Sequence, residues 1–276
     1  MNELHPDTVV FGNGWYTSRQ KIENIPEPCC IVVDTKHTFS NHLPTIYVQV
    51  EPQCIIPSAQ YLIENCHKYH TIYTFNQLVL DKCTNAKKYA YGTAWISPNN
   101  RDISKKQFKI SSLSGSKRMG GSRGHVLRQT LYHHQHLFHD IPITWYRSRV
   151  QIPYLTDYGN NPLLSSKNEL FDEFQFTLVI ENSKETNYFT EKIMDCLLTK
   201  TIPIYWGCPN IAEFFDTTGW IILETESVEE LQEKGRTLTS EYYHKYTDII
   251  EKNYEKAKTY MHFTDNLNHA VSPHRK

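Results

Sequence analysis

Short apolar runs that alternate with helical stretches constrain the fold of this chain more than any other feature. In Ile202–Tyr205, apolar side chains stand on consecutive residues instead of alternate ones. A strand with one solvated face alternates apolar and polar residues, so this pattern predicts strands that are buried on both faces. Buried strands separated by helices are typical of parallel sheets. We therefore expect an α/β fold built from parallel sheets.

The same alternation continues along most of the chain. Segments that favour strands are Thr8–Phe11, Cys30–Val33, Ile46–Val50, Thr71–Thr74, Phe108–Ser112, Ile143–Tyr146, Phe176–Ile180, Ile202–Trp206 and Trp220–Leu223. Segments that favour helices are Ser58–His67, Asn76–Cys83, Gly124–Phe138, Thr190–Thr199 and Asn210–Phe215. After Val228 the sequence becomes charged and helical through about Met261, and a polar tail follows.

A polar segment, Ser97–Lys106, separates two halves of this pattern. Its sequence, SPNNRDISKK, contains a proline and opens with turn-forming residues, which favours a domain boundary. We expect an amino-terminal α/β domain over residues 1–103 and a Rossmann-like domain over residues 104–276. The final helices are expected to cross back to the first half.

Composition and charge exclude several classes of protein. Hydrophobic residues make up 39% and charged residues 21% of the chain, which suits packed cores and argues against disorder. The 29 Lys and Arg balance 30 Asp and Glu, whereas a dedicated nucleic-acid-binding protein is usually basic. The 7 cysteines include no C-x-x-C pair, so neither a disulfide framework nor a structural zinc site of that kind is expected.

The densest group of candidate functional residues lies in the segment 176–210, FTLVIENSKETNYFTEKIMDCLLTKTIPIYWGCPN. Its first strand delivers Glu181 to the carboxyl end, and a helix begins near Thr190, a residue type favoured at the N-cap. Glu191 and Lys192 therefore occupy the first helical turn. Ligands of α/β sheets bind at the carboxyl ends of strands, and a helix N-terminus carrying a lysine suits a diphosphate.

This segment resembles glycosyltransferase family 10, the α-1,3-fucosyltransferases. Their signature combines an F-E-N-S-like strand end, a Y-x-T-E-K that opens a helix, and an apolar strand ending in P-I-Y-W-G. The matching residues are Ile180-Glu181-Asn182-Ser183, Tyr188-Phe189-Thr190-Glu191-Lys192 and Pro203-Ile204-Tyr205-Trp206-Gly207. The resemblance implies two Rossmann-like domains that face a cleft, the GT-B arrangement, in which the carboxyl-terminal half binds a sugar nucleotide.

A looser match upstream extends the resemblance to the donor site. The strand Phe108–Ser112 is followed by a serine-rich turn, and then Gly124-His125-Val126-Leu127-Arg128 opens a helix. Family members similarly carry an arginine in the first turns of this helix. The resemblance implies that Arg128 clamps the diphosphate of the donor, as planar guanidinium groups do well. Lys117 would line the same pocket.

The resemblance also assigns roles in the main segment. Asn182 and Tyr188 would line the nucleotide pocket. Glu191 would accept hydrogen bonds from hydroxyl groups of the donor sugar or ribose. Lys192 would stabilise the departing diphosphate together with Arg128 and the helix amides.

The amino-terminal half should supply the catalytic base and the acceptor side. The family has a glutamate just after an apolar strand of that half, and Glu51 follows Ile46–Val50 here. Glu51 is therefore the candidate base for an inverting, single-displacement transfer to a hydroxyl group of a glycan or glycoprotein acceptor, a step in glycan biosynthesis. A strand-terminal surface carboxylate is the ordinary alternative at this position.

We expect neither a cofactor nor a metal. The expected substrate is a sugar nucleotide, most of all GDP-fucose. The chain contains no D-x-D motif of the kind that holds a divalent cation on a nucleotide sugar. Residues 1–10 form no secretory signal, and no apolar run is long enough to span a membrane. The chain is thus more similar to soluble microbial or viral members of the family, and we expect a cytoplasmic location and no nucleic-acid partner.

Two clusters offer competing interpretations. On one continuous helix His133, His136 and His139 would share a face, so a metal site is geometrically possible, although packed or solvated imidazoles are commoner. Eight basic residues against one acidic residue between Arg101 and Arg128 suggest a nucleic-acid surface, but the donor phosphates explain the same charges.

Donor and activity have alternatives as well. A family member could use UDP-xylose with the same fold and mechanism, and the loop Ser183–Asn187 does not distinguish the donors. A catalytically inactive relative would bind sugar nucleotides without turnover. Glu51 distinguishes that case, because loss of the base leaves donor binding intact.

Overall fold

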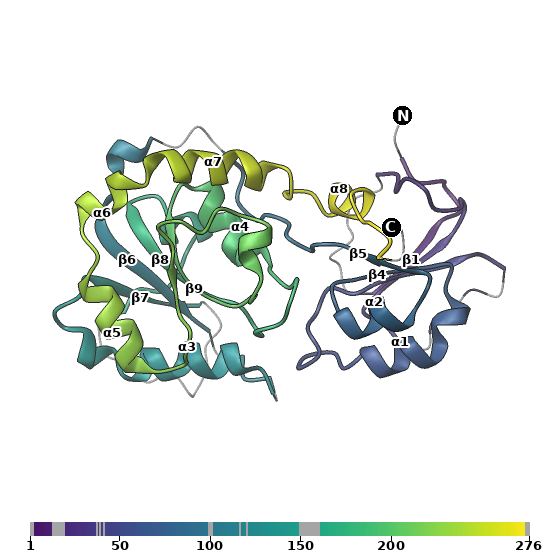
Figure 1. The fold of residues 1–276 in the computed structure, drawn as a ribbon, viewed down its shortest axis with the longest axis horizontal. Coiled ribbons are helices and arrows are strands. Elements are labelled where there is room, and N and C mark those ends of the chain that lie inside the picture. Colours follow the sequence, from purple (N-terminus) through teal and green to yellow (C-terminus); the bar gives the residue numbers. More distant parts are fainter. Residues whose placement is uncertain are drawn as a thin grey trace. The chain divides into compact units, whose positions relative to one another are not determined.

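The chain forms two compact α/β units (Figure 1). The computed structural model describes residues 3–12, 20–36, 38, 40, 42–98, 102–115, 117–119, 121–148 and 161–273. The first unit comprises Met1–Thr93, Glu185–Tyr188 and Thr259–Lys276, and the second comprises Ala94–Lys184 and Phe189–Lys258. Each unit has a five-stranded sheet with parallel pairing throughout. The prediction of two parallel-sheet α/β domains is confirmed.

The functional division at residues 103 and 104 stays a prediction. Within the boundary segment, residues 99–101 lie outside the described part of the chain.

The first unit is a sheet in sequence order, β1-β2-β3-β4-β5, covered on both faces. Its strands are β1 (Val9–Gly12), β2 (Cys30–Val33), β3 (Thr45–Val48), β4 (Thr71–Thr74) and β5 (Ala86–Lys88). Its helices are α1 (Ala59–Asn65), α2 (Gln77–Lys82) and α8 (Phe263–Asn268), with a 3-10 turn, η1, at Cys66–Lys68.

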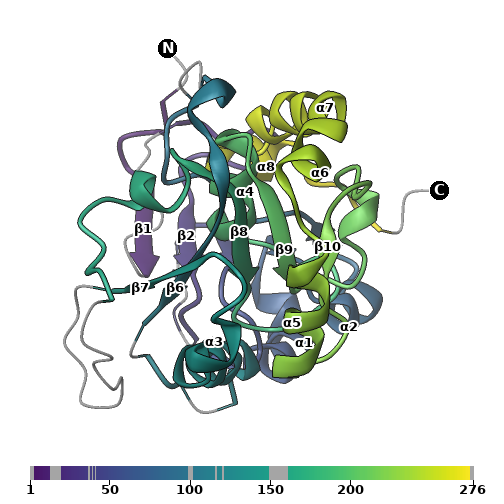
Figure 2. The same cartoon turned by 90° about the vertical axis from the view of Figure 1, so that its left-hand side faces the viewer.

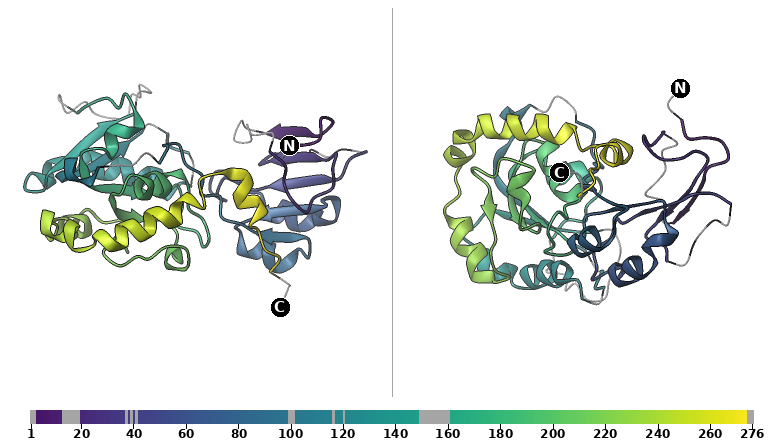
Figure 3. Two further views of the ribbon diagram at one scale, coloured as in Figure 1. Left: turned by 90° about the horizontal axis from the view of Figure 1, so that it is seen from above. Right: turned by 45° about the vertical axis from the view of Figure 1, so that its right-hand side comes forward.

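Alternate side chains of β2 point into two separate cores. Ile31 packs with Phe263 of α8, whereas Val32 packs with Leu62 of α1 and Val79 of α2. Figure 3 shows α8, in yellow, beside the sheet of this unit. Because both faces are covered, β2 is apolar on consecutive residues, as a strand of a parallel sheet must be.

The second unit carries the longer elements. Its strands are β6 (Gln107–Ser114), β7 (Ile143–Arg147), β8 (Phe174–Ile180), β9 (Ile202–Trp206) and β10 (Ile221–Ile222). Its α-helices are α3 (Arg123–His133), α4 (Glu191–Leu198), α5 (Val228–Arg236), α6 (Ser240–Lys245) and α7 (Thr247–Lys258). Short 3-10 helices are η2 (Ile103–Lys105), η3 (Gln135–Phe138), η4 (Lys167–Leu170) and η5 (Ile211–Glu213).

The strand order of this sheet, β10-β9-β8-β6-β7, creates a topological switch point. The chain passes from β6 through α3 to β7 in one direction, and from β8 through α4 to β9 in the other. Right-handed crossovers in opposite directions place α3 and α4 on opposite faces of the sheet, as Figure 1 shows. Figure 2 shows β8 and β9 running in the same direction. The carboxyl ends of β6 and β8 are therefore where a ligand is expected to bind.

The core of the second unit joins Phe176 of β8 to Leu127 of α3 and Tyr243 of α6. All seven residues of β8 are buried, and α4 buries Ile193, Met194, Cys196 and Leu197. The aromatic ring of Phe176 packs on Tyr243 of α6, with ring centroids 6.2 Å apart. The strands predicted as buried on both faces are thus confirmed here.

Two predicted elements were wrong in part, and one strand was not predicted. The helix expected over Gly124–Phe138 ends at His133, because the ring Nδ1 of His134 bonds the carbonyl oxygen of Thr130 at 2.8 Å and the backbone leaves α-helical geometry. The helix expected over Asn210–Phe215 is only the 3-10 turn η5. The edge strand β5 was missed because Ala86–Lys88 carries no apolar run.

Within the described part of the chain, no helix is both long enough and apolar enough to cross a membrane.

Candidate functional site

The site is built where α3 crosses the carboxyl end of β8. A side-chain carbon on Gly124 would lie 1.7 Å from the carbonyl oxygen of Glu181, so only glycine permits this approach. The backbone N–H of Gly124 donates to the carbonyl of Asn182 at 3.3 Å. The hydroxyl of Ser122, the N-cap of α3, donates to the same carbonyl at 2.8 Å. The first turn of α3 is thereby fixed against the end of β8.

Arg128 spans the last residues of β8 from the side of α3. Its guanidinium donates to the carbonyl oxygen of Ile180, to that of Glu181 at 3.5 Å and to the side-chain Oδ1 of Asn182 at 3.1 Å. These bonds orient a half-buried cation at the switch point, beside the residues that follow the strand.

Glu181 joins the end of β8 to the start of α4. Its fully buried carboxylate accepts hydrogen bonds from the backbone N–H of Thr190 at 2.9 Å and from its hydroxyl at 2.7 Å. A side-chain carbon on Gly207, after β9, would lie 2.6 Å from Cγ of Glu181, so this glycine leaves room for the carboxylate. Burial raises the pKa of Glu181, and the nearby Lys192 ammonium and the Thr190 donors limit the rise.

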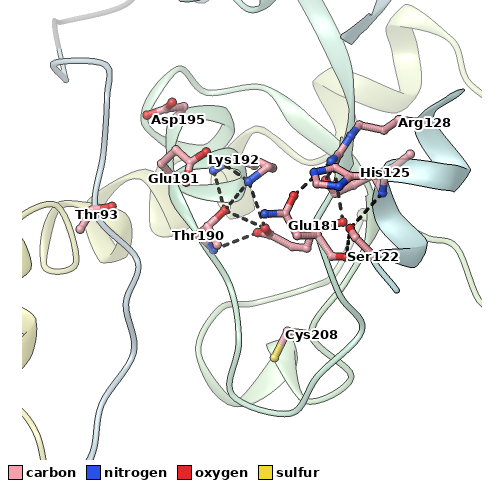
Figure 4. Close-up of polar contacts among 12 residues, drawn as sticks. Thr93, Ser122, His125, Arg128, Glu181, Thr190, Glu191, Lys192, Asp195 and Cys208 are labelled. Carbon is pink, nitrogen blue, oxygen red and sulfur yellow. Dashed lines mark hydrogen bonds and ion pairs between the residues drawn. The ribbon is translucent and has the colours of Figure 1, made fainter. Parts of the chain in front are cut away.

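Lys192, in the first turn of α4, has two carboxylate neighbours (Figure 4). Its Nζ lies 3.1 Å from Oε1 of Glu191, 3.7 Å from Oε2 of Glu181 and 3.0 Å from the hydroxyl oxygen of Thr190. Burial acts to lower the pKa of Lys192, but Glu191 and Glu181 hold it above its ordinary value. Burial acts to raise the pKa of Glu191, but Lys192 and Lys167 hold it below its ordinary value. Both groups are therefore charged at neutral pH.

A buried carboxylate farther along α4 anchors the helix. Oδ1 of Asp195 accepts the backbone N–H groups of Trp95 at 2.8 Å and Ile96 at 3.1 Å. Its Oδ2 lies 2.5 Å from Nζ of Lys167. The Lys167 ammonium also lies over the Trp95 ring, 4.2 Å from its centroid. These contacts hold the helix whose first turn carries Glu191 and Lys192.

The family profile "Glycosyltransferase family 10 (fucosyltransferase) C-term" matches residues 129–269, which is half of the chain. The chain belongs to glycosyltransferase family 10. Over 58 residues it is 40% identical to the alpha-(1,3)-fucosyltransferase of Helicobacter pylori. That match spans 21% of the family 10 chain and only 12% of the relative.

Several solved glycosyltransferase structures have the same fold as this chain. The crystal structure of an alpha1,3-fucosyltransferase with GDP matches at a TM-score of 0.53 and 15% identity, over 97% of this chain and 89% of that one. The crystal structure of an alpha1,3-fucosyltransferase with GDP-fucose matches at a TM-score of 0.53 and 14% identity, over 91% of this chain and 82% of that one. A trehalose-6-phosphate synthase matches at a TM-score of 0.53 and 11% identity, over 87% of this chain and 70% of that one. At these identities the likeness shows the fold, which is GT-B.

The structure of the family 10 chain brings together four of the predicted donor residues, which lie around the end of β8 and the start of α4: Arg128, Asn182, Glu191 and Lys192. Lys117 is exposed on the loop after β6, close enough for its charge to act on His125. Tyr188 belongs to the first unit, where it is 1% exposed and its ring packs on Phe75 at 5.0 Å between centroids.

Glu51 follows β3 in the first unit and is partly buried. Its backbone N–H donates to Oδ2 of Asp34 at 2.8 Å, and that of Val50 donates to Oδ1 at 3.0 Å. Burial raises the pKa of Asp34 to about 7. The two hydrogen bonds act to lower this pKa, and the charge of the neighbouring Glu51 acts to raise it. Asp34 thus fixes the backbone of the candidate base.

Three residues with clear structural roles were not assigned a role from the sequence: Asp34, His125 and Glu181. Asp34 and Glu181 carried a usable signal, since both directly follow a buried strand. His125 stood inside the matched helix start but carried no signal of its own.

No group of three His, Cys, Asp or Glu residues suited to a metal ion occurs among the residues that the structure describes. The alternative in which His133, His136 and His139 share one helical face does not hold, because α3 stops at His133.

Proposed function

We propose that this family 10 chain transfers L-fucose from GDP-fucose to a hydroxyl group of a glycan by a single displacement with inversion. The carrying observation is the group of Arg128 and Lys192 around the end of β8, at the topological switch point of the second sheet. Membership of family 10 supports the choice of sugar, and the fold likeness to structures with GDP and GDP-fucose supports the choice of nucleotide.

The donor diphosphate is proposed to lie at the first turn of α4. Arg128 and Lys192 would hold its oxygens, with the backbone N–H groups after Thr190 adding their dipoles. The Lys192 ammonium pairs with the carboxylates of Glu181 and Glu191. A bound diphosphate would replace part of these two ion pairs. Asn182, Tyr188 and Lys117 are proposed to line the nucleotide pocket, and Glu191 to accept from donor hydroxyl groups.

Glu51 is proposed to take the proton of the acceptor hydroxyl. The acceptor oxygen then forms its bond to the anomeric carbon, while the bond from that carbon to the diphosphate oxygen breaks and its electron pair stays with the diphosphate. The developing charge falls near Arg128 and Lys192, which can stabilise it electrostatically without a divalent cation. We propose on this ground that transfer is metal-independent.

A transfer assay tests this proposal. Labelled GDP-fucose and labelled UDP-xylose are each incubated with a panel of glycan acceptors, in the presence of EDTA, and the anomeric configuration of any product is compared with that of the donor. We expect inverted fucosyl product from GDP-fucose, and loss of product with retained GDP binding in Glu51→Gln. Product from UDP-xylose alone, or a retained configuration, would overturn the proposal.

A further inference from the structure

His125 is a buried histidine in the candidate site, and the proposed mechanism so far gives it no role. It is 6% exposed, and its Nδ1 accepts a hydrogen bond from the backbone N–H of Met119 at 3.4 Å. Because Nδ1 is the acceptor, the neutral ring carries its proton on Nε2. Among the residues that the structure describes, none forms a hydrogen bond with this Nε2–H.

Positive charges face this ring from three elements. Arg128 lies one turn along α3, Lys117 stands on the loop before that helix, and Lys192 lies on the first turn of α4. Burial and these three cations lower the pKa of His125 to about 4, so the ring is neutral at physiological pH. The carboxylates of this region, Glu181 and Glu191, are already paired with Lys192.

A neutral N–H donor among cations is suited to an anion (Figure 4). We propose that His125 is a further ligand of the donor diphosphate, to which its Nε2–H donates a hydrogen bond beside Arg128 and Lys192. This inference rests on the proposed function, which places the diphosphate here. As the bond to the sugar breaks, the diphosphate gains negative charge, and a hydrogen bond to it strengthens.

Two substitutions separate the two ring nitrogens. In His125→Asn, the side-chain oxygen reaches about as far as Nδ1, so it can still accept from Met119, but the distal donor is lost. In His125→Gln, the amide reaches about as far as Nε2 and can supply that donor. Thermal unfolding of both variants establishes that they fold.

Calorimetric titration with GDP, inorganic pyrophosphate and guanosine measures the effect. We expect His125→Asn to weaken the binding of GDP and of pyrophosphate about tenfold, which is the usual effect of losing a hydrogen bond to a charged group. The affinity for guanosine should not change. His125→Gln should recover most of the loss. A bound anion should also raise the pKa of the ring, so near pH 5 the wild type should take up more protons on binding than His125→Asn does.

The outcomes separate this inference from the proposed function. If the wild type binds GDP and His125→Asn binds it equally well, the role of His125 is overturned while the proposed donor stands. If pyrophosphate binds in a His125-dependent way and GDP adds nothing to it, the guanine donor is overturned while the role of His125 stands. A wild type that binds neither compound overturns both.

Discussion

The carboxylate of Glu181 accepts hydrogen bonds from both the backbone N–H and the hydroxyl of Thr190, at 2.9 Å and 2.7 Å. Glu181 directly follows β8 and Thr190 is the N-cap of α4, and Glu185–Tyr188 between them belong to the other unit. The pair therefore closes the loop at its base. It fixes the first turn of α4, and with it Lys192, whatever path the intervening residues take.

Replacing Thr190 tests this pair. Thr190→Val keeps the size of the side chain but removes the hydroxyl donor of the buried Glu181 and one of the acceptors of Lys192, which keeps Glu191. We expect unfolding in urea to show a loss of about 1–3 kcal/mol, with weaker GDP binding. Thr190→Ser keeps the hydroxyl and is the matched control. Equal losses in both variants would contradict a role for the hydroxyl.

Gly124 should tolerate no side chain. In Gly124→Ala the new carbon meets the carbonyl oxygen of Glu181, so α3 must move away from β8. We expect a loss of at least about 2–3 kcal/mol in stability and loss of GDP binding. Gly115→Ala is the control, since its new carbon would make only an ordinary contact, 3.5 Å from the hydroxyl oxygen of Ser148. A melting temperature of Gly124→Ala equal to that of the wild type would contradict the close approach of Gly124 to the carbonyl oxygen of Glu181.

Asp34 should make stability depend on pH. Its pKa of about 7 in the fold exceeds the ordinary value of 3.8, so between these values the folded chain holds more protons than the unfolded chain. The stability that this proton provides is present at low pH and is lost as pH rises toward 7.

We expect the wild type to lose on the order of 3 kcal/mol relative to Asp34→Asn between pH 4 and 7, measured by denaturant unfolding. Parallel pH profiles for the two proteins would show that Asp34 is ionised at no cost in the fold.

Lys106 should support the second unit without affecting the donor. Its buried ammonium donates to the carbonyl oxygens of Phe171 at 2.6 Å and Phe174 at 2.9 Å, and to the hydroxyl of Thr201 at 2.8 Å. Lys106→Met should cost about 2–4 kcal/mol, because it removes a buried, charged donor from all three acceptors at once.

The control is Lys109→Met, whose exposed pair with Glu173 at 3.9 Å should contribute under about 1 kcal/mol. Both variants should bind GDP normally at temperatures where they are folded. Equal stability of the two variants would contradict the structural role of Lys106.

Strand positions followed from sequence where a run is buried on both faces. β2, β4 and β9 begin and end at the predicted residues, and every residue of these three strands is buried. The edge strand β5 was missed because partial burial imposes no apolar pattern on it. The length of α3 was overestimated because a side-chain bond, from His134 to the carbonyl of Thr130, helps to end that helix.

From the residues alone, the donor site could be placed at the end of β8 and the first turn of α4, because ligands of α/β sheets bind at the carboxyl ends of strands. That logic placed Asn182 and Lys192 near one another, and the resemblance to the family added Arg128. It could not reveal the bonds of Glu181 to Thr190, since a sequence does not show how a loop closes. Nor could it show that His125 is buried among cations, which depends on how α3 and α4 meet the end of β8.

The affinity for GDP of the wild type and of Lys192→Ala, measured by calorimetry without divalent cations, tests the central claim most directly. Lys184→Ala removes the same charge from an exposed lysine, whose Nζ bonds the carbonyl oxygen of Glu224 at 3.0 Å, and is the control. We predict that Lys192→Ala weakens GDP binding about a hundredfold, while Lys184→Ala leaves it within about twofold of the wild type. Unchanged affinity in Lys192→Ala would contradict a diphosphate site at the first turn of α4.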